Sequence, residues 1–307
     1  MMLTSISIIS CKKDDDTGPE AVPVRDRGEQ AIEDDEALMA YLQTHFYNEE
    51  DFENPSEGFD YRIKFDSIAG VNSDKTALID SDLLETKVVT RNEVDYNVYI
   101  LKIREGVGAH PTFADSTFQN YRGELLNEIS FDNTANPVWF DHPGTLSQGN
   151  PGIAVVALTE ALTEFGGASN FVVNEDNTVT FTDDFGVGAV FLPSGLGYFS
   201  NSQGAIPAYS PLIFSFQLYK VNEADHDQDG IPSYLEDLDN DRIVANDDSD
   251  ENTIPNYLDV DDDGDGTLTR DEITINEDGT VSFPDRNGNG IPNYLDPDEF
   301  ENVNEVQ

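Results

Sequence analysis

The last quarter of the chain carries oxygen-bearing side chains at every second position, in short runs that repeat. Three of these runs are followed by an Ile-Pro-x-Tyr-Leu segment, at residues 231–235, 254–258 and 291–295. A further run, residues 261–272, satisfies the whole D-x-[DN]-x-[DN]-G-x5-E pattern of a calcium loop. Oxygens at loop positions 1, 3 and 5 converge on one point when a sharp turn follows them, and a carboxylate at position 12 closes the coordination sphere. The repetition therefore predicts four loops that bind Ca2+.

The four loops differ in how well they match the pattern. Residues 248–259 match least, because Thr253 takes the place of the turn glycine, and residues 285–296 carry fewer charges. A fifth and weaker candidate, residues 237–248, has Arg242 in place of the glycine. The predicted ligands are Asp225, Asp227, Asp229, Glu236, Asp248, Asp250, Asn252, Asp259, Asp261, Asp263, Asp265, Thr267, Glu272, Asp285, Asn287, Asn289 and Asp296. Without metal the segment is expected to be disordered, because its charges repel and its apolar content is low.

The loops are not expected to form EF-hands, in which a helix lies on each side of the calcium loop. Proline stands at position 8 in three of them, and the flanks are too short for long helices. The abutting loops resemble the thrombospondin type-3 calcium repeats of secreted and surface proteins. The resemblance implies an irregular domain, residues 223–307, in which Ca2+ replaces a hydrophobic core. His226 stands at loop position 2 and is expected to point outward, with no metal role.

The charge of the chain excludes several partners. The formal net charge is −46, from 62 acidic and 16 basic residues, and half of it lies from Asp225 to the last residue, where 26 residues are acidic and 3 are basic. Binding to nucleic acid needs a basic surface, and docking on anionic lipid headgroups needs one too, so neither is expected. The hydrophobic content of 37% is enough for a folded core in the rest of the chain.

The N-terminus suggests a lipid anchor. Residues 3–10 are apolar or small and lead to Cys11, the only cysteine, which is followed by Lys-Lys-Asp-Asp-Asp. A lone cysteine cannot form an intramolecular disulfide. This arrangement resembles the lipobox and tether of Bacteroidetes-type lipoproteins, which implies a lipid on Cys11 and an outer-membrane location, on the periplasmic or cell-surface face. The alternative is a buried, inert cysteine, and no Lys or Arg precedes the apolar run.

Between the N-terminus and the main domain, the pattern predicts a linker and a mixed extension. Residues 12–28 are polar with Pro and Gly, as in a flexible linker. Within the extension, residues 29–93, apolar residues at three- and four-residue spacing predict a helix over 29–47. Alternation predicts strands at 57–66 and 95–103, with a long loop or hairpin insertion between them.

The central segment carries an ordered set of motifs. Tyr121-Arg122-Gly123-Glu124-Leu125 is followed by Phe131-Asp132-Asn133-Thr134, then by Leu192-Pro193-Ser194-Gly195-Leu196-Gly197-Tyr198, Ala205-Ile206-Pro207-Ala208 and Leu212-Ile213-Phe214-Ser215-Phe216-Gln217-Leu218. In order and spacing, this set resembles the FKBP-type peptidyl-prolyl cis–trans isomerases over residues 94–222. The implied fold class is α+β, with an antiparallel sheet wrapped on a short helix. The chain would thus have a helix before this domain and an irregular calcium-repeat tail after it.

The resemblance implies a pocket and a chemistry. Rotation about a peptide bond has a barrier of about 18–20 kcal/mol, and an apolar pocket that orients an X–Pro peptide lowers it without a nucleophile or a cofactor. The resemblance places Tyr121, Phe131, Ile206 and Phe214 in the wall of the pocket and Val155 beside it. Asp132 would be a hydrogen-bonding group near the floor. The Tyr198 hydroxyl would donate to a substrate carbonyl, and the Ile206 N–H would bind the peptide backbone beside the proline. Leu158 stands where the family has a tryptophan, which implies a smaller base and a wider pocket.

Three functions remain open at this stage. The first is a lipid-anchored isomerase that folds exported, proline-containing polypeptides. The second is the same fold without useful catalysis, as a peptide-binding module or chaperone, which Leu158 favours. The third is a surface protein made rigid by calcium, in which the isomerase-like domain is a scaffold.

An inserted hairpin is expected within residues 169–188, and His110 and His142 are expected at the surface.

Overall fold

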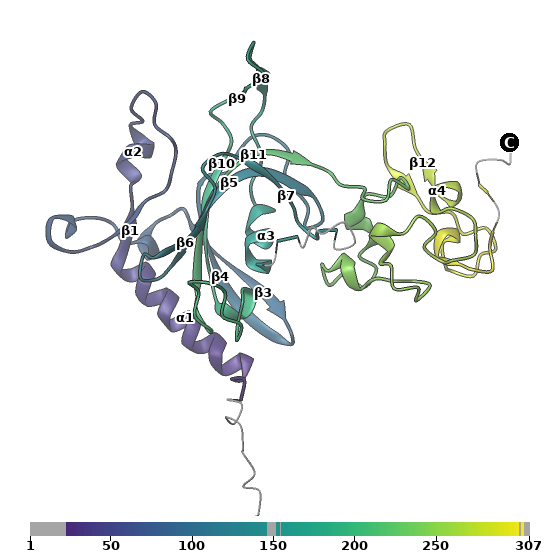
Figure 1. Ribbon diagram of the computed structural model, residues 1–307, viewed down its shortest axis with the longest axis horizontal. Coiled ribbons are helices and arrows are strands. Elements are labelled where there is room, and N and C mark those ends of the chain that lie inside the picture. The colour runs from purple at the N-terminus through teal and green to yellow at the C-terminus, as the bar shows by residue number, and fades with distance from the viewer. Residues whose placement is uncertain (1–22, 146–151, 154, 301, 304–307) are drawn as a thin grey trace, which may run out of the picture.

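A computed structural model describes residues 23–145, 152–153, 155–300 and 302–303 (Figure 1). Cys11 and the first 22 residues, with the predicted signal segment and most of the linker, lie outside the described residues. The central element is an antiparallel sheet with strand order β3-β4-β10-β11-β5-β6, in which β7 also pairs with β5. Its strands are β3 (Leu84–Arg91), β4 (Val94–Arg104), β5 (Ser116–Leu125), β6 (Ser130–Asn133), β7 (Val138–Asp141), β10 (Gly186–Leu192) and β11 (Leu212–Asn222). The predicted α+β class with an antiparallel sheet is therefore confirmed.

Two helices cover opposite faces of this sheet (Figure 1). The short helix α3 (Val156–Leu162) packs on the face formed by Ile100, Val190 and Phe214. The long helix α1 (Arg27–Thr44) packs on the other face, against the residues that alternate with these. Strand β10 lies between the two layers and is buried along its whole length, as expected for a central strand with no polar face.

The N-terminal extension differs from its predicted form. Helix α1 ends at Thr44, not at residue 47, because the next three residues form strand β1 (His45–Tyr47), paired with β2 (Phe65–Ser67). The predicted strand over 57–66 is reduced to the start of β2. A five-residue helix, α2 (Glu49–Glu53), lies between β1 and β2.

The sheet begins earlier than the boundary placed at residue 94. Strand β3 pairs with β4 in continuous register, from Leu84 opposite Leu101 to Arg91 opposite Val94. The position 94 is therefore inside a β-hairpin, whose turn residues Asn92 and Glu93 both have positive φ. Strand β3 is half exposed, so its sequence lacks the apolar density that marks β4. The predicted inserted hairpin is confirmed as β8 (Phe171–Val173) and β9 (Val179–Phe181).

The acidic tail is a series of loops joined by short helical turns. These are η5 (Ser233–Glu236), η6 (Val244–Asn246), η7 (Asn256–Leu258), α4 (Thr269–Glu272) and η8 (Asn293–Leu295), with a small hairpin of β12 (Thr274–Ile275) and β13 (Val281–Ser282). Position 6 has positive φ in all five candidate loops, at Gly230, Arg242, Thr253, Gly266 and Gly290. The sharp turn that a calcium loop needs is thus present even where glycine is replaced.

The tail packs on the central domain beside helix α3 (Figure 1). His226 is nearly buried and contacts Asp141 of β7 at 2.9 Å, so the expectation that it points outward is wrong. The Tyr257 hydroxyl donates to the carbonyl of Gly144 at 2.9 Å, and Arg242 pairs with Glu160 of α3 at 2.7 Å. The other ring nitrogen of His226 lies 2.8 Å from the Ser233 hydroxyl of its own loop, so the imidazole links that loop to β7. Within the described residues, no helix combines the length and apolar character needed to cross a membrane.

Candidate functional site

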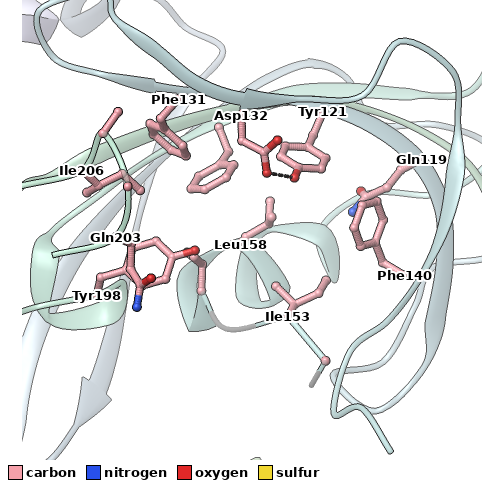
Figure 2. Close-up of a pocket in the computed structure, with 15 residues that line it drawn as sticks. Gln119, Tyr121, Phe131, Asp132, Phe140, Ile153, Leu158, Tyr198, Gln203 and Ile206 are labelled. Carbon is pink, nitrogen blue, oxygen red and sulfur yellow. Dashed lines mark hydrogen bonds between the residues drawn. The ribbon is translucent and has the colours of Figure 1, made fainter. Parts of the chain in front are cut away.

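A cavity of about 330 Å³ lies between helix α3 and the concave side of the sheet (Figure 2). All eight residues predicted for the isomerase pocket line it: Tyr121, Phe131, Asp132, Val155, Leu158, Tyr198, Ile206 and Phe214. They come from β5, β6, β11, the start of α3 and the segment between β10 and β11. The structure therefore brings together side chains that are up to 93 residues apart, from Tyr121 to Phe214.

Three aromatic rings form one wall of the cavity. The Phe214 ring lies 5.9 Å from the Tyr121 ring and 5.5 Å from the Phe131 ring, the second pair edge to face. Gly123 of β5 makes this arrangement possible, because a Cβ there would lie 2.4 Å from the Phe131 ring. Leu158 rises from α3 at the base, opposite these rings (Figure 2). The wall and base are apolar surfaces that keep water away from a bound group.

The polar groups of the cavity are few. The Tyr121 hydroxyl donates a hydrogen bond to the Asp132 carboxylate, and the Asn133 N–H donates to the same carboxylate at 2.8 Å. The Tyr198 hydroxyl has no hydrogen-bond partner among the described residues and points into the cavity (Figure 2). Burial, followed by the charge of Asp132, raises the pKa of Tyr198, so this hydroxyl stays protonated. It is therefore a hydrogen-bond donor that a ligand can use.

The backbone of Ile206 is not in the state that its predicted role requires. Its N–H donates to the Gln203 carbonyl at 2.8 Å, and the Gln203 N–H donates back to the Ile206 carbonyl at 3.0 Å. The expectation of an Ile206 N–H directed at a ligand is therefore corrected: this bond closes the turn, because the two residues form an isolated antiparallel bridge. The Ile206 side chain still lines the cavity.

Several lining residues were not identified from the sequence. They are Gln119, Phe140, Gly152, Ile153, Gln203, Gly204 and Ala205. Gln119 precedes Tyr121 by two residues on the same strand, so period-2 alternation was a usable signal for it. Phe140 lies next to Trp139, which is exposed and packs on Phe118 outside the cavity. Because the two aromatics are consecutive residues of one strand, their side chains lie on opposite faces of the sheet. No sequence signal indicated which of the two faces the cavity.

His142, expected at the surface, is buried. One of its ring nitrogens lies 3.0 Å from the Thr117 hydroxyl, and burial lowers its pKa to about 4. A neutral imidazole in this position holds the end of β7 against β5. It belongs to the scaffold of the site, since it does not line the cavity.

The acidic loops share one internal hydrogen-bond pattern. In each predicted loop the backbone N–H at position 6 donates to the carboxylate at position 1, as from Gly230 to Asp225 at 3.2 Å and from Gly266 to Asp261 at 3.1 Å. The residue at position 9 accepts from the N–H at position 2, as from His226 to Ser233 at 3.2 Å. The repeat in sequence is thus a repeat in structure.

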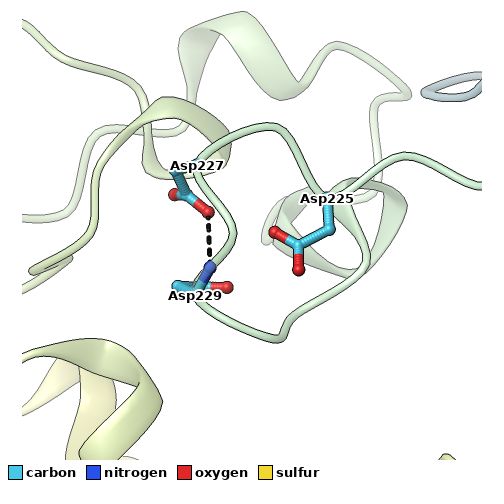
Figure 3. A group of neighbouring side chains, drawn as sticks. All are labelled: Asp225, Asp227 and Asp229. Carbon is cyan, nitrogen blue, oxygen red and sulfur yellow. Dashed lines mark hydrogen bonds between the residues drawn. The ribbon is translucent and has the colours of Figure 1, made fainter.

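Two of the loops bring unpaired carboxylates together. One oxygen from each of Asp225, Asp227 and Asp229 lies within 4.8 Å of the others, and the same holds for Asp261, Asp263 and Asp265. Figure 3 shows the first three side chains on their loop. Each of these six side chains has a buried oxygen with no hydrogen-bond partner. Oxygen-only donors at this spacing fit Ca2+, which takes six to eight hard oxygens, and the structure thus offers places for the ion.

Burial makes these carboxylates costly as bare anions. It raises the pKa of Glu236 to about 11, with a further contribution from neighbouring carboxylates. It raises the pKa of Asp227 to about 8 and that of Glu272 to about 8, again with neighbouring carboxylates contributing. A divalent cation would remove this cost by replacing the protons.

The other two predicted loops satisfy their carboxylates internally. The side-chain amide of Asn252 donates to Asp259 at 2.6 Å. The amides of Asn287 and Asn289 both donate to Asp296 at 2.8 Å, and the first of these bonds is the main reason that the pKa of Asp296 is lowered. These loops therefore fit a cation less well than the loops at 225–236 and 261–272.

Comparison with known proteins gives one family match and several structural ones. The family described as BamM C-terminal matches residues 226–284, so the matched family for the tail is not the thrombospondin type-3 repeat that its sequence resembles. No curated protein matches the chain. A peptidyl-prolyl cis–trans isomerase from Pseudomonas syringae is 17% identical over 46% of this chain and 83% of its own, with a TM-score of 0.32.

Two further solved structures are similar to the same extent. FkpA from Escherichia coli is 19% identical over 46% of this chain and 53% of its own, with a TM-score of 0.33. The N-terminal domain of FKBP42 from Arabidopsis thaliana is 16% identical over 45% of this chain and 93% of its own, with a TM-score of 0.32. At identities and TM-scores this low, function has to be inferred from the site itself.

Proposed function

We propose that this chain is a peptidyl-prolyl cis–trans isomerase of the FKBP type, acting on X–Pro bonds of exported polypeptides, with a tail that binds Ca2+. The observation that supports the activity most is the composition of the cavity. Its wall and base are apolar or aromatic, it has one carboxylate, at Asp132, and one unpartnered hydroxyl, at Tyr198. This combination suits a reaction that breaks no covalent bond.

The proposed catalysis follows from the physics of the amide. Rotation about the X–Pro bond breaks the resonance of the imide and reduces its charge separation, so a water-poor, apolar site favours the twisted state over the planar one. The rings of Phe131 and Phe214 and the side chain of Leu158 would surround the proline and exclude water. The Tyr198 hydroxyl would donate to a carbonyl of the peptide, and the Tyr121–Asp132 hydrogen bond would hold the wall in place.

A second candidate function is peptide binding without useful catalysis, as in a chaperone that holds its client. The hydrogen bond from the Ile206 N–H to Gln203 favours it, because that donor would have to be released before it could orient a substrate backbone. Leu158 at the base favours it too, since a smaller side chain constrains the proline less. Binding and catalysis are separable by experiment, because only catalysis changes the rate of isomerisation.

Substitution of Tyr198 by Phe is expected to lower kcat/KM for a proline tetrapeptide by about 2- to 10-fold, since a neutral hydrogen bond is worth roughly 0.5–1.5 kcal/mol. The melting temperature should stay the same, because the hydroxyl has no partner within the described residues. Both quantities are measured on the full chain in the presence of Ca2+. An unchanged kcat/KM would remove Tyr198 from the proposed mechanism.

The folding role is tested on a protein substrate whose refolding is limited by one X–Pro isomerisation. Catalytic amounts of the chain should accelerate that slow phase and leave the fast phases unchanged. A holdase would instead reduce the refolded yield or slow the phase at stoichiometric amounts. The second result would favour the non-catalytic function.

We also propose that the chain is a lipoprotein of the outer membrane, anchored through Cys11. The lipobox-like segment before this cysteine supports the proposal. Expressed in a bacterium with its N-terminus intact, the chain should incorporate labelled palmitate and sediment with membranes, and Cys11→Ser should lose both properties. Equal labelling of the serine variant would contradict the anchor.

A further inference from the structure

Asp262 is an acidic residue of the tail that the calcium-loop pattern does not use. It stands at position 2 of the loop 261–272, between two of that loop's predicted ligands. Position 2 of the other three predicted loops holds His226, Ser249 and Arg286, none of which is acidic. Only 2% of Asp262 is exposed, so the chain buries a carboxylate where its own repeat does not require one.

The side chain of Asp262 faces a different loop. One oxygen of Asp262 lies within 4.8 Å of one oxygen each of Asp229 and Glu236, which belong to the loop 225–236, and the latter two are equally close to each other. Thr269 fixes this orientation: its hydroxyl donates to Asp262 Oδ2 at 2.9 Å and accepts from the Asp262 N–H at 3.1 Å. The other carboxylate oxygen, Oδ1, accepts no hydrogen bond from the described residues.

The three carboxylates are buried and incompletely satisfied. Glu236 has no exposed surface, and neither of its oxygens has a hydrogen-bond partner. Asp229 Oδ2 and Asp262 Oδ1 are also buried without a partner. Three anionic groups cannot share a buried site of this size without a counter-charge, because their desolvation is costly and they repel one another. Hard oxygens in this number and at this spacing select a divalent cation such as Ca2+.

We propose that Asp229, Glu236 and Asp262 bind a calcium ion that joins the first loop of the tail to the third. This inference rests on the proposed calcium binding of the tail and adds a ligand that the loop pattern omits. Asp229 is also in the cluster with Asp225 and Asp227, and Glu236 is the position-12 residue of the same loop, so the joining site shares both of these ligands with the first loop. The first and third loops are therefore parts of one metal-dependent unit.

The apolar contacts beside the cluster agree with such a unit. Ile231 of the first loop, Ile273 at the end of α4 and Tyr294 of the last loop form a small buried core. Ion binding at the junction would bring the same segments together. Occupation of the first loop and of the third loop should consequently be cooperative.

The test is a calcium titration of the full chain and of Asp262→Asn, with bound ions counted by native mass spectrometry and affinities measured by calorimetry. The matched control is Glu277→Gln, which removes one exposed carboxylate from the turn between β12 and β13. Asp262→Asn should lose one bound ion, or bind it at least about tenfold more weakly, whereas the control should match the wild type. The gain in melting temperature on adding Ca2+ should shrink only in Asp262→Asn.

Two results would overturn the inference in different ways. If the wild type binds several ions and Asp262→Asn binds the same number with the same affinities, Asp262 is not a ligand, although the tail still binds calcium. If the wild type binds none, the calcium proposal for the tail is wrong as a whole. Should Asp262→Asn fail to fold, Asp262→Glu decides: a ligand role predicts retained binding of the ion at lower affinity, and loss of folding in this variant as well would contradict it.

Discussion

Chelation of calcium is expected to unfold the tail, residues 225–296, while the sheet of the central domain stays folded. The reason is electrostatic: bare carboxylates such as Glu236 and Asp263 are buried with unpartnered oxygens, and each such group costs several kcal/mol. The sum exceeds the 5–15 kcal/mol that typically stabilises a whole domain. Hydrogen exchange followed by mass spectrometry, with and without EDTA, should show loss of protection across the tail.

The peptides of β4, β10 and β11 serve as the internal control, since their protection should not change.

The order of the metal-free tail should also depend on pH. Without calcium, burial raises the pKa of Asp229 to about 7 and that of Asp227 to about 8 in the folded tail. In the unfolded tail both pKa values are near 4. The contribution of these two groups to the free energy of unfolding is therefore fully present below pH 4 and is lost as the pH rises through 7–8. The metal-free tail should therefore be more ordered at pH 5 than at pH 8. Tail protection that is unaffected by EDTA at pH 8 would contradict this account.

Substitution of Asp132 by Asn is expected to lower kcat/KM for an X–Pro peptide by roughly 10- to 100-fold. Asp132 is the one acidic or basic side chain among the described residues that line the cavity, and it accepts the hydrogen bond of the Tyr121 hydroxyl. A hydrogen bond to a charged group is worth roughly 1.5–3 kcal/mol, and 1.36 kcal/mol corresponds to a factor of ten in rate. Kinetics with a proline tetrapeptide measure the effect.

Asp95→Asn on β4 is the matched control, because it makes the same chemical change at an exposed carboxylate outside the cavity. If Asp132 acts by holding Tyr121, then Tyr121→Phe and Asp132→Asn should be non-additive in the double variant. Full activity of Asp132→Asn, in a protein with the wild-type melting temperature, would show that the carboxylate has no part in the reaction.

The pocket was predictable because its residues lie in short motifs whose order and spacing resemble those of the FKBP-type isomerases. Tyr121, Phe131 and Phe214 were assigned together, and β5 does lie between β6 and β11. The state of the Ile206 N–H was not predictable, because it depends on a hydrogen bond made by the folded turn. Leu158 was placed at the cavity because it stands where the FKBP-type family that the segment resembles has a tryptophan, and it does line the cavity.

Relations between distant segments were beyond the reach of sequence patterns. Strand β3 was missed because it is half exposed and gains its place only by pairing with β4. The loop pattern predicted ligands within each loop, since they are local, but it gave no role to Asp262, whose neighbouring carboxylates lie in another loop. Similarly, the contact of His226 with Asp141 depends on how the tail docks against β7.

The central claim, catalysis of X–Pro isomerisation, is tested most directly by NMR exchange spectroscopy on a proline tetrapeptide with substoichiometric full chain in Ca2+. The account predicts cis–trans exchange cross-peaks on the subsecond timescale, against an uncatalysed isomerisation of tens to hundreds of seconds. Asp132→Asn should reduce the exchange rate. If the peptide resonances shift on binding to the folded protein and the exchange rate stays at the uncatalysed value, the chain binds peptides but is not an isomerase.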